Sequence, residues 1–236
     1  MNNIMKAIVA LVMVCCVFSS IPIESHASPI LSGTVTASKL NLREKATASS
    51  ARLGSIPKGS IIHVYSLTNN GWSETWFNKK KAFVQTKYIK LSPQISFKKD
   101  KKKVYTYWES GSIGTQRYLQ KIKGKNVWEA QGNGYHISYI EDETKNGLYY
   151  ETSDGGRKLV IPFPLVSGKT WYDGSRQINI ITSLTKTVKT PAGTFTNAIE
   201  IKSGSLTFYF ARNHAHIKTI NNNRVITLLK TISYRK

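Results

Sequence analysis

Closely spaced turn signals constrain this chain more than any other feature of its sequence. Glycine recurs beside asparagine, aspartate or serine, and short runs rich in apolar and β-branched residues separate these turns. Such dipeptides are typical of the tight turns of β-hairpins. No segment shows a sustained helical repeat of apolar residues. The sequence therefore predicts an all-β protein built from antiparallel sheets. In the longer, C-terminal part, the turns are expected at 132–134, 146–147, 154–156, 173–174, 191–193, 203–204 and 221–223.

Residues 33–91 carry short apolar runs with frequent turns, which predicts several short strands and hence a small barrel. Leu40 and Leu42 alternate with Asn41 and Arg43. Because successive side chains of a strand point to opposite faces, we expect the leucines in the core and the polar pair outside it.

Five landmarks follow one another in this region. They are Gly33-Thr-Val-Thr-Ala-Ser, Leu40-Asn-Leu-Arg, Leu53-Gly-Ser-Ile-Pro-Lys-Gly, Asn70-Gly-Trp and Lys87-Tyr-Ile. In this order they resemble the bacterial SH3 (SH3b) domain, which implies a small SH3-like barrel with a ligand groove. The sequence departs from the family pattern in two groove-bordering loops, with Glu-Lys-Ala at 44–46 and Ala82 where the family usually has glycine.

Aromatic side chains supply the predicted ligand site. Trp72, Glu74 and Trp76 recur with period two, and a small barrel rarely buries two indoles beside a carboxylate. We therefore expect at least one tryptophan to line a groove, although Trp72 could instead plug the barrel end. Aromatic faces can pack on sugar rings or peptide segments, while nearby cations meet carboxylate or phosphate. The predicted ligand-binding residues are Asn41, Arg43, Tyr65, Trp72, Trp76, Phe83 and Tyr88.

Residues 104–236 are expected to form a larger antiparallel β domain, either a sandwich or an open barrel. Segments 164–171, 188–195 and 197–201 resemble a β-rich domain common in exported bacterial proteins and lipoproteins of unassigned function. That resemblance implies a fold and supplies no chemistry. The expected strands are 104–109, 117–122, 126–131, 135–141, 148–152, 158–161, 177–189, 194–202, 206–211, 215–220 and 224–234.

Residues 1–27 are predicted to be a signal peptide. Lys6 precedes an apolar run at 7–18, and Ser25-His-Ala27 matches a small-x-small cleavage site. The run is short for a membrane span of about 20 residues, although retention as an anchor is the alternative. Both cysteines lie in this peptide, so the exported chain would have none and no stable membrane span. This combination suits secretion or cell-wall association in a Gram-positive bacterium.

The charge of the chain is strongly positive. It contains 34 lysines and arginines against 13 aspartates and glutamates, a net charge of +21. Such an excess attracts polyanions. For an exported protein we expect peptidoglycan, teichoic acid or both as partners, and no nucleic acid. Residues 92–103 include a run of lysines, which predicts a solvated basic linker between the two domains.

His214 and His216 could share one face of a strand and contact one zinc ion. Catalytic zinc sites use three protein ligands, and the upstream His-x-x-x-Asp motif of lysostaphin-like peptidases is absent from the sequence. We therefore expect two surface histidines, no metal and no cofactor.

No catalytic residue is predicted. The exported chain would lack a cysteine nucleophile, and the sequence contains no Gly-x-Ser-x-Gly elbow. The adjacent acids Glu141, Asp142 and Glu143 are expected to be solvated in a polar loop. The sequence thus predicts a secreted, non-enzymatic protein whose SH3b module binds the cell wall. The alternatives are a cell-wall hydrolase with an unrecognised C-terminal catalytic domain, and an accessory factor that binds another exported protein.

Overall fold

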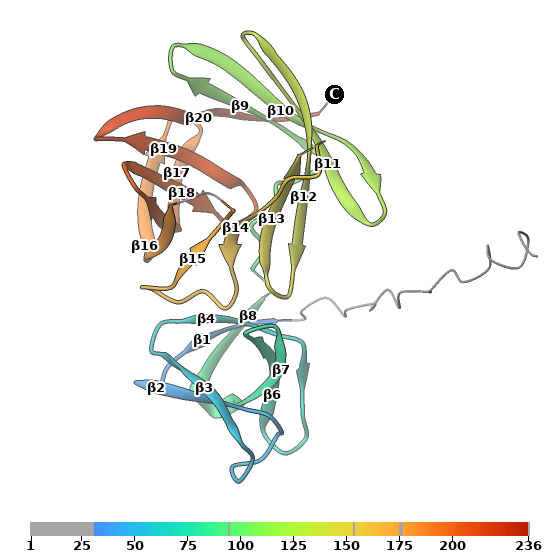
Figure 1. Cartoon of the computed structure of the whole chain (residues 1–236), viewed down its shortest axis with the longest axis vertical. Coiled ribbons are helices and arrows are strands. Elements are labelled where there is room, and N and C mark those ends of the chain that lie inside the picture. The colour runs from blue at the N-terminus through green and yellow to red at the C-terminus, as the bar shows by residue number, and fades with distance from the viewer. Residues whose placement is uncertain (1–30, 94, 153, 175–176, 236) are drawn as a thin grey trace, which may run out of the picture.

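The computed structural model describes residues 31–93, 95–152, 154–174 and 177–235, and the predicted signal peptide lies outside them. The described residues form a small β-barrel followed by a larger curled sheet (Figure 1). This architecture confirms the all-β prediction with a small barrel before a larger antiparallel domain. No helix in the described part of the chain has the length and apolar composition that a membrane crossing requires.

The small barrel combines two antiparallel sheets and a short 3-10 helix. Leu40 and Leu42 are buried, whereas Asn41 points outward and Arg43 is half-buried, as the alternation predicted. Its core is aliphatic, with Val35, Ile56 and Ile62 among its buried members. The elements of this unit are β1 (Leu31–Val35), β2 (Lys39–Arg43), β3 (Arg52–Pro57), β4 (Ile61–Val64), β5 (Ser66–Leu67), β6 (Trp72–Phe77), β7 (Lys80–Gln85), η1 (Thr86–Tyr88) and β8 (Ile89–Pro93).

Within the described residues, the larger unit is a twelve-stranded sheet in which neighbouring strands are antiparallel. Most strands pair with the next one along the chain, and β9 also pairs with β20. The predicted turns join these strands; Gly193, for example, adopts a positive φ of 141° at the start of β17, where it pairs with Thr190 of β16. The strands are β9 (Lys103–Glu109), β10 (Ser112–Ile122), β11 (Lys125–Gly132), β12 (Tyr135–Thr144), β13 (Gly147–Thr152), β14 (Arg157–Pro162), β15 (Thr170–Tyr172), β16 (Ile178–Thr190), β17 (Gly193–Ser203), β18 (Leu206–Ala211), β19 (Ala215–Asn221) and β20 (Arg224–Tyr234).

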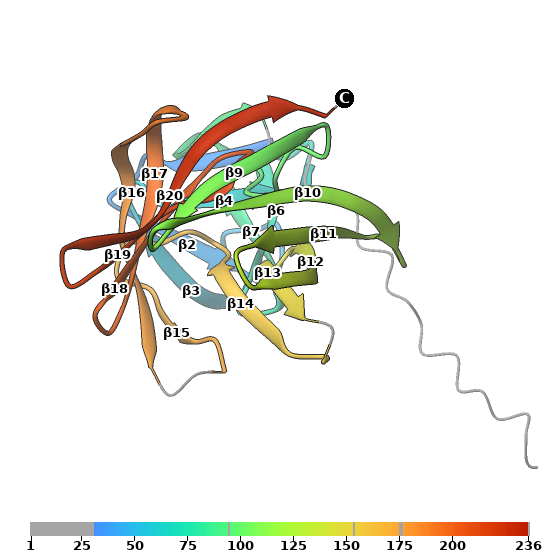
Figure 2. The same ribbon diagram turned by 90° about the horizontal axis from the view of Figure 1, so that it is seen from above.

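The sheet curls into a nearly closed barrel, as the view from above shows (Figure 2). Its edge strands are β14 and β15, and the short strand β15 was not predicted from the sequence. The Trp171 indole Nε1–H in β15 donates a hydrogen bond of 2.9 Å to the Leu159 carbonyl in β14. This bond links the two edges, so of the two architectures left open by the sequence the open barrel is the one observed.

The prediction of a solvated linker is wrong for residues 95–99 of the basic segment. Ile95, Phe97 and Lys99 are buried, with exposed fractions of 6%, 1% and 4%. They alternate with more exposed neighbours, so the segment is extended and inserts one face into the protein. Ile95 and Phe97 join the apolar core of the larger barrel.

Lys99 is buried because its charge is compensated on several sides. Its ammonium Nζ lies 3.0 Å from Glu141 Oε1 and 4.7 Å from the centroid of the Trp128 ring. The rings of Tyr139 and Tyr150 contact the same ammonium. Burial disfavours the ammonium, but the Glu141 carboxylate outweighs this effect and keeps the pKa of Lys99 above its ordinary value.

The two units share a packed junction. Ile61 of β4 and Leu165 exchange backbone hydrogen bonds of 3.0 and 2.9 Å, and both side chains belong to the core of the larger barrel. The buried His63 ring lies 4.3 Å from the Phe163 ring. Val166 in turn packs against the core of the small barrel. The loop after β14 thus connects both hydrophobic cores.

The Lys99→Met substitution is expected to lower the free energy of unfolding by about 3–5 kcal/mol, since it leaves the Glu141 carboxylate buried without its partner charge. Adding Glu141→Gln removes that charge and should recover most of the loss. Chemical denaturation measures both effects. Lys81→Met is the control. Lys81 pairs with Glu74, but 54% of the Lys81 side chain is exposed, so this substitution should lower the free energy of unfolding by about 1 kcal/mol or less. Equal losses in the single and double variants would contradict this account.

Acid is expected to destabilise the junction through His63. Burial lowers the pKa of His63 to about 4, against about 6.5 in an unfolded chain. Between these values the unfolded state binds more protons, so stability present above pH 6.5 is lost as the pH falls toward 4. The contribution of this group is about 3 kcal/mol. The free energy of unfolding, measured with denaturant across this pH window, should fall less steeply with pH for His63→Leu than for the parent protein. An equally steep fall in both proteins would refute the role assigned to His63.

Candidate functional site

A groove of about 370 Å³ opens on the small barrel. Strand β2 contributes Asn41 and Arg43 to it, the start of β6 contributes Trp72, and η1 contributes Tyr88. The site therefore brings together two polar side chains and two aromatic rings from three separate elements. Its remaining lining residues are Ala37, Lys39, Leu40, Ala48 and Gln85.

Local contacts hold the groove in shape. The Arg43 guanidinium Nη1 donates a hydrogen bond of 2.6 Å to the Ser50 carbonyl, which fixes the arginine beside the loop after β2. Trp72 is 7% exposed, and its backbone N–H donates to the Thr68 hydroxyl at 3.0 Å. Tyr88 is 39% exposed, so its ring is available at the rim. The groove thus combines a nearly buried indole with an accessible phenol.

The two tryptophans of β6 have different environments. Trp72 and Trp76 lie on the outer face of the strand, since the partners of Ser73 and Thr75 are the core residues Val84 and Ala82. Trp72 lines the groove. Lys145 of the larger barrel covers the Trp76 ring, with Nζ 3.2 Å from its centroid. Of the two tryptophans, the one that lines the groove is therefore Trp72.

Two further predicted residues also lie outside the groove. The Tyr65 hydroxyl is buried, and it has no hydrogen-bond partner among the described residues. Burial, followed by the charges of Glu143 and Glu74, raises the pKa of Tyr65. Phe83 is half-buried in β7, where it pairs with Arg43 and Glu74 across the sheet. Of the seven predicted residues, all described, the structure gathers Asn41, Arg43, Trp72 and Tyr88 around one groove.

Sequence reasoning missed Lys39 and Gln85 as groove residues. The alternation in β2 could have revealed Lys39, because Lys39 points to the same face of the strand as Asn41 and Arg43. Gln85 is the direct partner of Trp72 between β6 and β7, which only the strand register reveals. Lys39 and Arg43 give the groove positive charge, and an arginine guanidinium can bind a carboxylate or phosphate through two hydrogen bonds.

The expectation of two surface histidines is wrong. His214 packs edge-on against Phe195 and Tyr105, and His216 stacks on Tyr107. His214 precedes β19, and Ala215 has a positive φ of 53°, so the alternation that would place both imidazoles on one strand face is broken. Burial lowers the pKa of both imidazoles, that of His216 to about 4. In the described residues no group of three or more His, Cys, Asp or Glu side chains is placed to hold a metal ion.

The three adjacent acids lie in strand β12 rather than in a polar loop. Glu141 binds Lys99, and the Glu143 carboxylate accepts a hydrogen bond of 2.7 Å from the Phe97 backbone N–H. Asp142 points to the opposite face.

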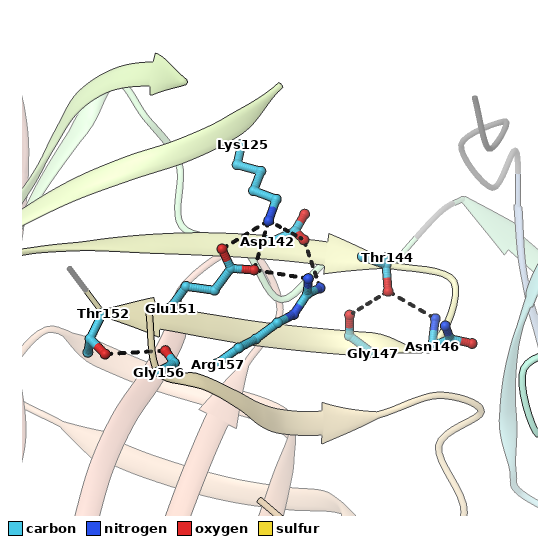
Figure 3. Close-up of polar contacts among 9 residues, drawn as sticks. All are labelled: Lys125, Asp142, Thr144, Asn146, Gly147, Glu151, Thr152, Gly156 and Arg157. Atoms are coloured by element: carbon cyan, nitrogen blue, oxygen red, sulfur yellow. Dashed lines mark hydrogen bonds and ion pairs between the residues drawn. The ribbon is translucent and has the colours of Figure 1, made fainter. Parts of the chain in front are cut away.

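Asp142 belongs to a network of four charged side chains across β11 to β14 (Figure 3). Its carboxylate lies 3.0 Å from Arg157 Nη2 and 3.8 Å from Lys125 Nζ. Glu151 contacts the same two cations, at 3.0 and 2.8 Å. Each carboxylate is therefore paired with two cations, an arrangement that supports the sheet and presents no pair of free acids for hydrolysis.

Comparison with known proteins agrees with the small barrel. The model of the bacterial SH3 domain family matches residues 38–90. The cell wall-binding protein YwsB of Bacillus subtilis (strain 168) is 35% identical over 93 residues, which are 39% of this chain and 52% of YwsB. The chain thus spans about half the length of the curated relative it matches. No solved structure matches the chain significantly. The barrel that carries the groove, at residues 38–90, is a bacterial SH3 domain.

Proposed function

We propose that this protein is exported and binds the bacterial cell wall noncovalently through the groove of its SH3 domain. The observation that carries the proposal is the convergence of Arg43, Trp72 and Tyr88 on one groove. The rings offer apolar faces to a sugar or peptide segment, and the guanidinium offers hydrogen bonds to an anionic group. A relative of this domain is named as a cell wall-binding protein, which supports the same reading.

The net charge of +21 contributes to wall binding in addition to the contacts made in the groove. Long-range attraction raises the concentration of the protein near anionic wall polymers such as teichoic acid, and salt weakens this attraction. Contacts inside the groove are short-ranged and persist at high salt. The two contributions can therefore be separated by ionic strength.

Substitution of the groove tyrosine tests the specific contribution. Tyr88→Ala is expected to weaken binding to purified walls by about fivefold, or about 1 kcal/mol, because the ring faces the groove with 39% of the residue exposed. The measurement is co-sedimentation of residues 28–236 with walls in about 1 M salt, where the Debye length is about 3 Å. Trp76→Ala is the matched control, since Lys145 covers that ring outside the groove. Equal affinities of Tyr88→Ala and the parent protein for the walls would refute the proposal that the groove binds the wall.

Removal of teichoic acid tests the contribution of charge. At low salt, walls stripped of teichoic acid should bind less protein than intact walls, and the difference should vanish in about 1 M salt. Release of soluble wall fragments is measured in the same samples, and none is expected. Fragment release by the pure protein would overturn the non-enzymatic assignment and favour a hydrolase.

A further inference from the structure

A second cavity, of about 590 Å³, opens on the larger barrel, and its lining is rich in lysine. Its lysines are Lys98, Lys99, Lys101, Lys103 and Lys121. The first four come from the segment before β9 and the start of that strand, and the last comes from the end of β10. The remaining lining residues are Ser96, Asp100, Gly124, Asn126, Asn213 and His214. Five lysines and a single acid therefore line this cavity.

Two of these lysines are already paired with acids. Lys99 Nζ lies 3.0 Å from Glu141, and Lys103 Nζ lies 3.7 Å from Asp100. The Asp100 carboxylate also accepts a hydrogen bond of 3.0 Å from the backbone N–H of Lys102. The one acid of the lining is thus held by groups of its own segment, and its charge is balanced there.

Two other side chains add little unbalanced charge. Burial raises the pKa of Glu143, and the nearby charge of Lys98 opposes this effect, so Lys98 and Glu143 attract each other. Burial lowers the pKa of His214, so its imidazole is uncharged at neutral pH. The remaining positive charge of the cavity comes from Lys101 and Lys121.

Lys101 and Lys121 are exposed, and neither takes part in an ion pair with an acid of the described residues. The Lys101 ammonium Nζ lies 5.4 Å from the centroid of the Tyr118 ring on β10, the strand that carries Lys121. Lys121 is the direct partner of Asn126 on β11, so these two side chains share one face of the sheet. The cavity therefore combines two unbalanced ammonium groups with a neighbouring amide.

This combination favours an anion that carries more than one charged group. Lysine binds phosphate as a compact point charge, whereas arginine is favoured where a planar carboxylate is held at two points. The lining contains no arginine. The Asn126 amide can donate a hydrogen bond to a phosphate oxygen. At about 30 Å³ per water-sized group, the cavity has room for roughly twenty such groups, enough for several linked phosphates.

We propose that this cavity binds a chain of phosphate groups. Lys101 and Lys121 contact different phosphates of the chain, and the Asn126 amide donates to one of their oxygens. Wall teichoic acid and inorganic polyphosphate both offer this chemistry. The site lies outside the SH3 groove, so the choice of teichoic acid rests on the proposed function, whereas the site itself does not.

Isothermal titration calorimetry with inorganic pyrophosphate tests the site, using residues 28–236 at pH 7.5. The salt concentration is about 0.15 M, where the Debye length is about 8 Å and distant charges are screened. One saturable site per chain is expected. Citrate carries a similar charge on carboxylates and should bind at least about fivefold more weakly. The absence of saturable pyrophosphate binding, or equal binding of citrate, would overturn the proposal.

Matched pairs of substitutions separate the cavity from the net charge. Lys101→Gln combined with Lys121→Gln should weaken pyrophosphate binding about tenfold. Lys102→Gln combined with Lys123→Gln removes the same charge from neighbouring positions outside the lining, and should change the affinity less than about twofold. All four lysines are exposed, and circular dichroism establishes that both variants are folded. Equal losses in the two variants would reduce the binding to net charge and refute the site.

The same two variants identify the source of the phosphate chain. Purified teichoic acid and inorganic polyphosphate are titrated separately. The partner is the polymer whose affinity falls in the Lys101 and Lys121 variant but not in the control. If neither polymer shows this difference, the proposal is wrong.

Substitution of Arg43 distinguishes this site from the SH3 groove. Arg43→Gln removes the guanidinium of the groove, so it should weaken wall binding and leave the pyrophosphate affinity unchanged. Failure of the groove to bind walls would therefore not affect the pyrophosphate titration. Loss of pyrophosphate binding in Arg43→Gln would place the anion in the groove and overturn the assignment to the larger barrel.

Discussion

The buried ion pair between Lys99 and Glu141 organises the larger barrel. Neither side chain has more than 1% of its surface exposed, so each charge depends on the other for compensation. The pair fixes an extended segment, and this segment places Ile95 and Phe97 in the barrel core. The segment that joins the two units is therefore part of the interior of the larger barrel. A flexible tether would let the units move independently, whereas this segment anchors the SH3 domain to the sheet.

This anchoring also divides the surface of the SH3 domain. One part faces the larger barrel, where Ile61, His63 and Trp76 make contacts across the junction. The groove of Trp72 and Tyr88 lies elsewhere on the domain. Aromatic residues that look equivalent in the sequence thus have separate roles, one set in cohesion between the units and the other in a surface suited to a ligand.

The fold could be predicted from the sequence because its signals are local. The alternation of Leu40 and Leu42 with polar neighbours, and the glycines and asparagines at the turns, each specify a strand or a hairpin without reference to distant residues. The predictions were wrong where contacts between residues far apart in the sequence determine the structure. Ile95, Phe97 and Lys99 alternate too, but the lysine run obscured the pattern because the compensating carboxylate is 42 residues away. Tyr65 and Trp76 were grouped with the groove because nothing local reveals the neighbouring barrel.

The pairing of β9 with β20 has a consequence for the order of folding. The SH3 barrel is built from one continuous segment, so a chain that emerges from its N-terminus can complete that core early. The larger barrel joins its first strand to its last, and such non-local contacts slow folding. Until β20 arrives, β9 keeps an exposed edge that can pair with another chain. Most of the core of the early domain can thus form before the later strands, while the larger barrel acquires the pairing of β9 only after β20 has been synthesised.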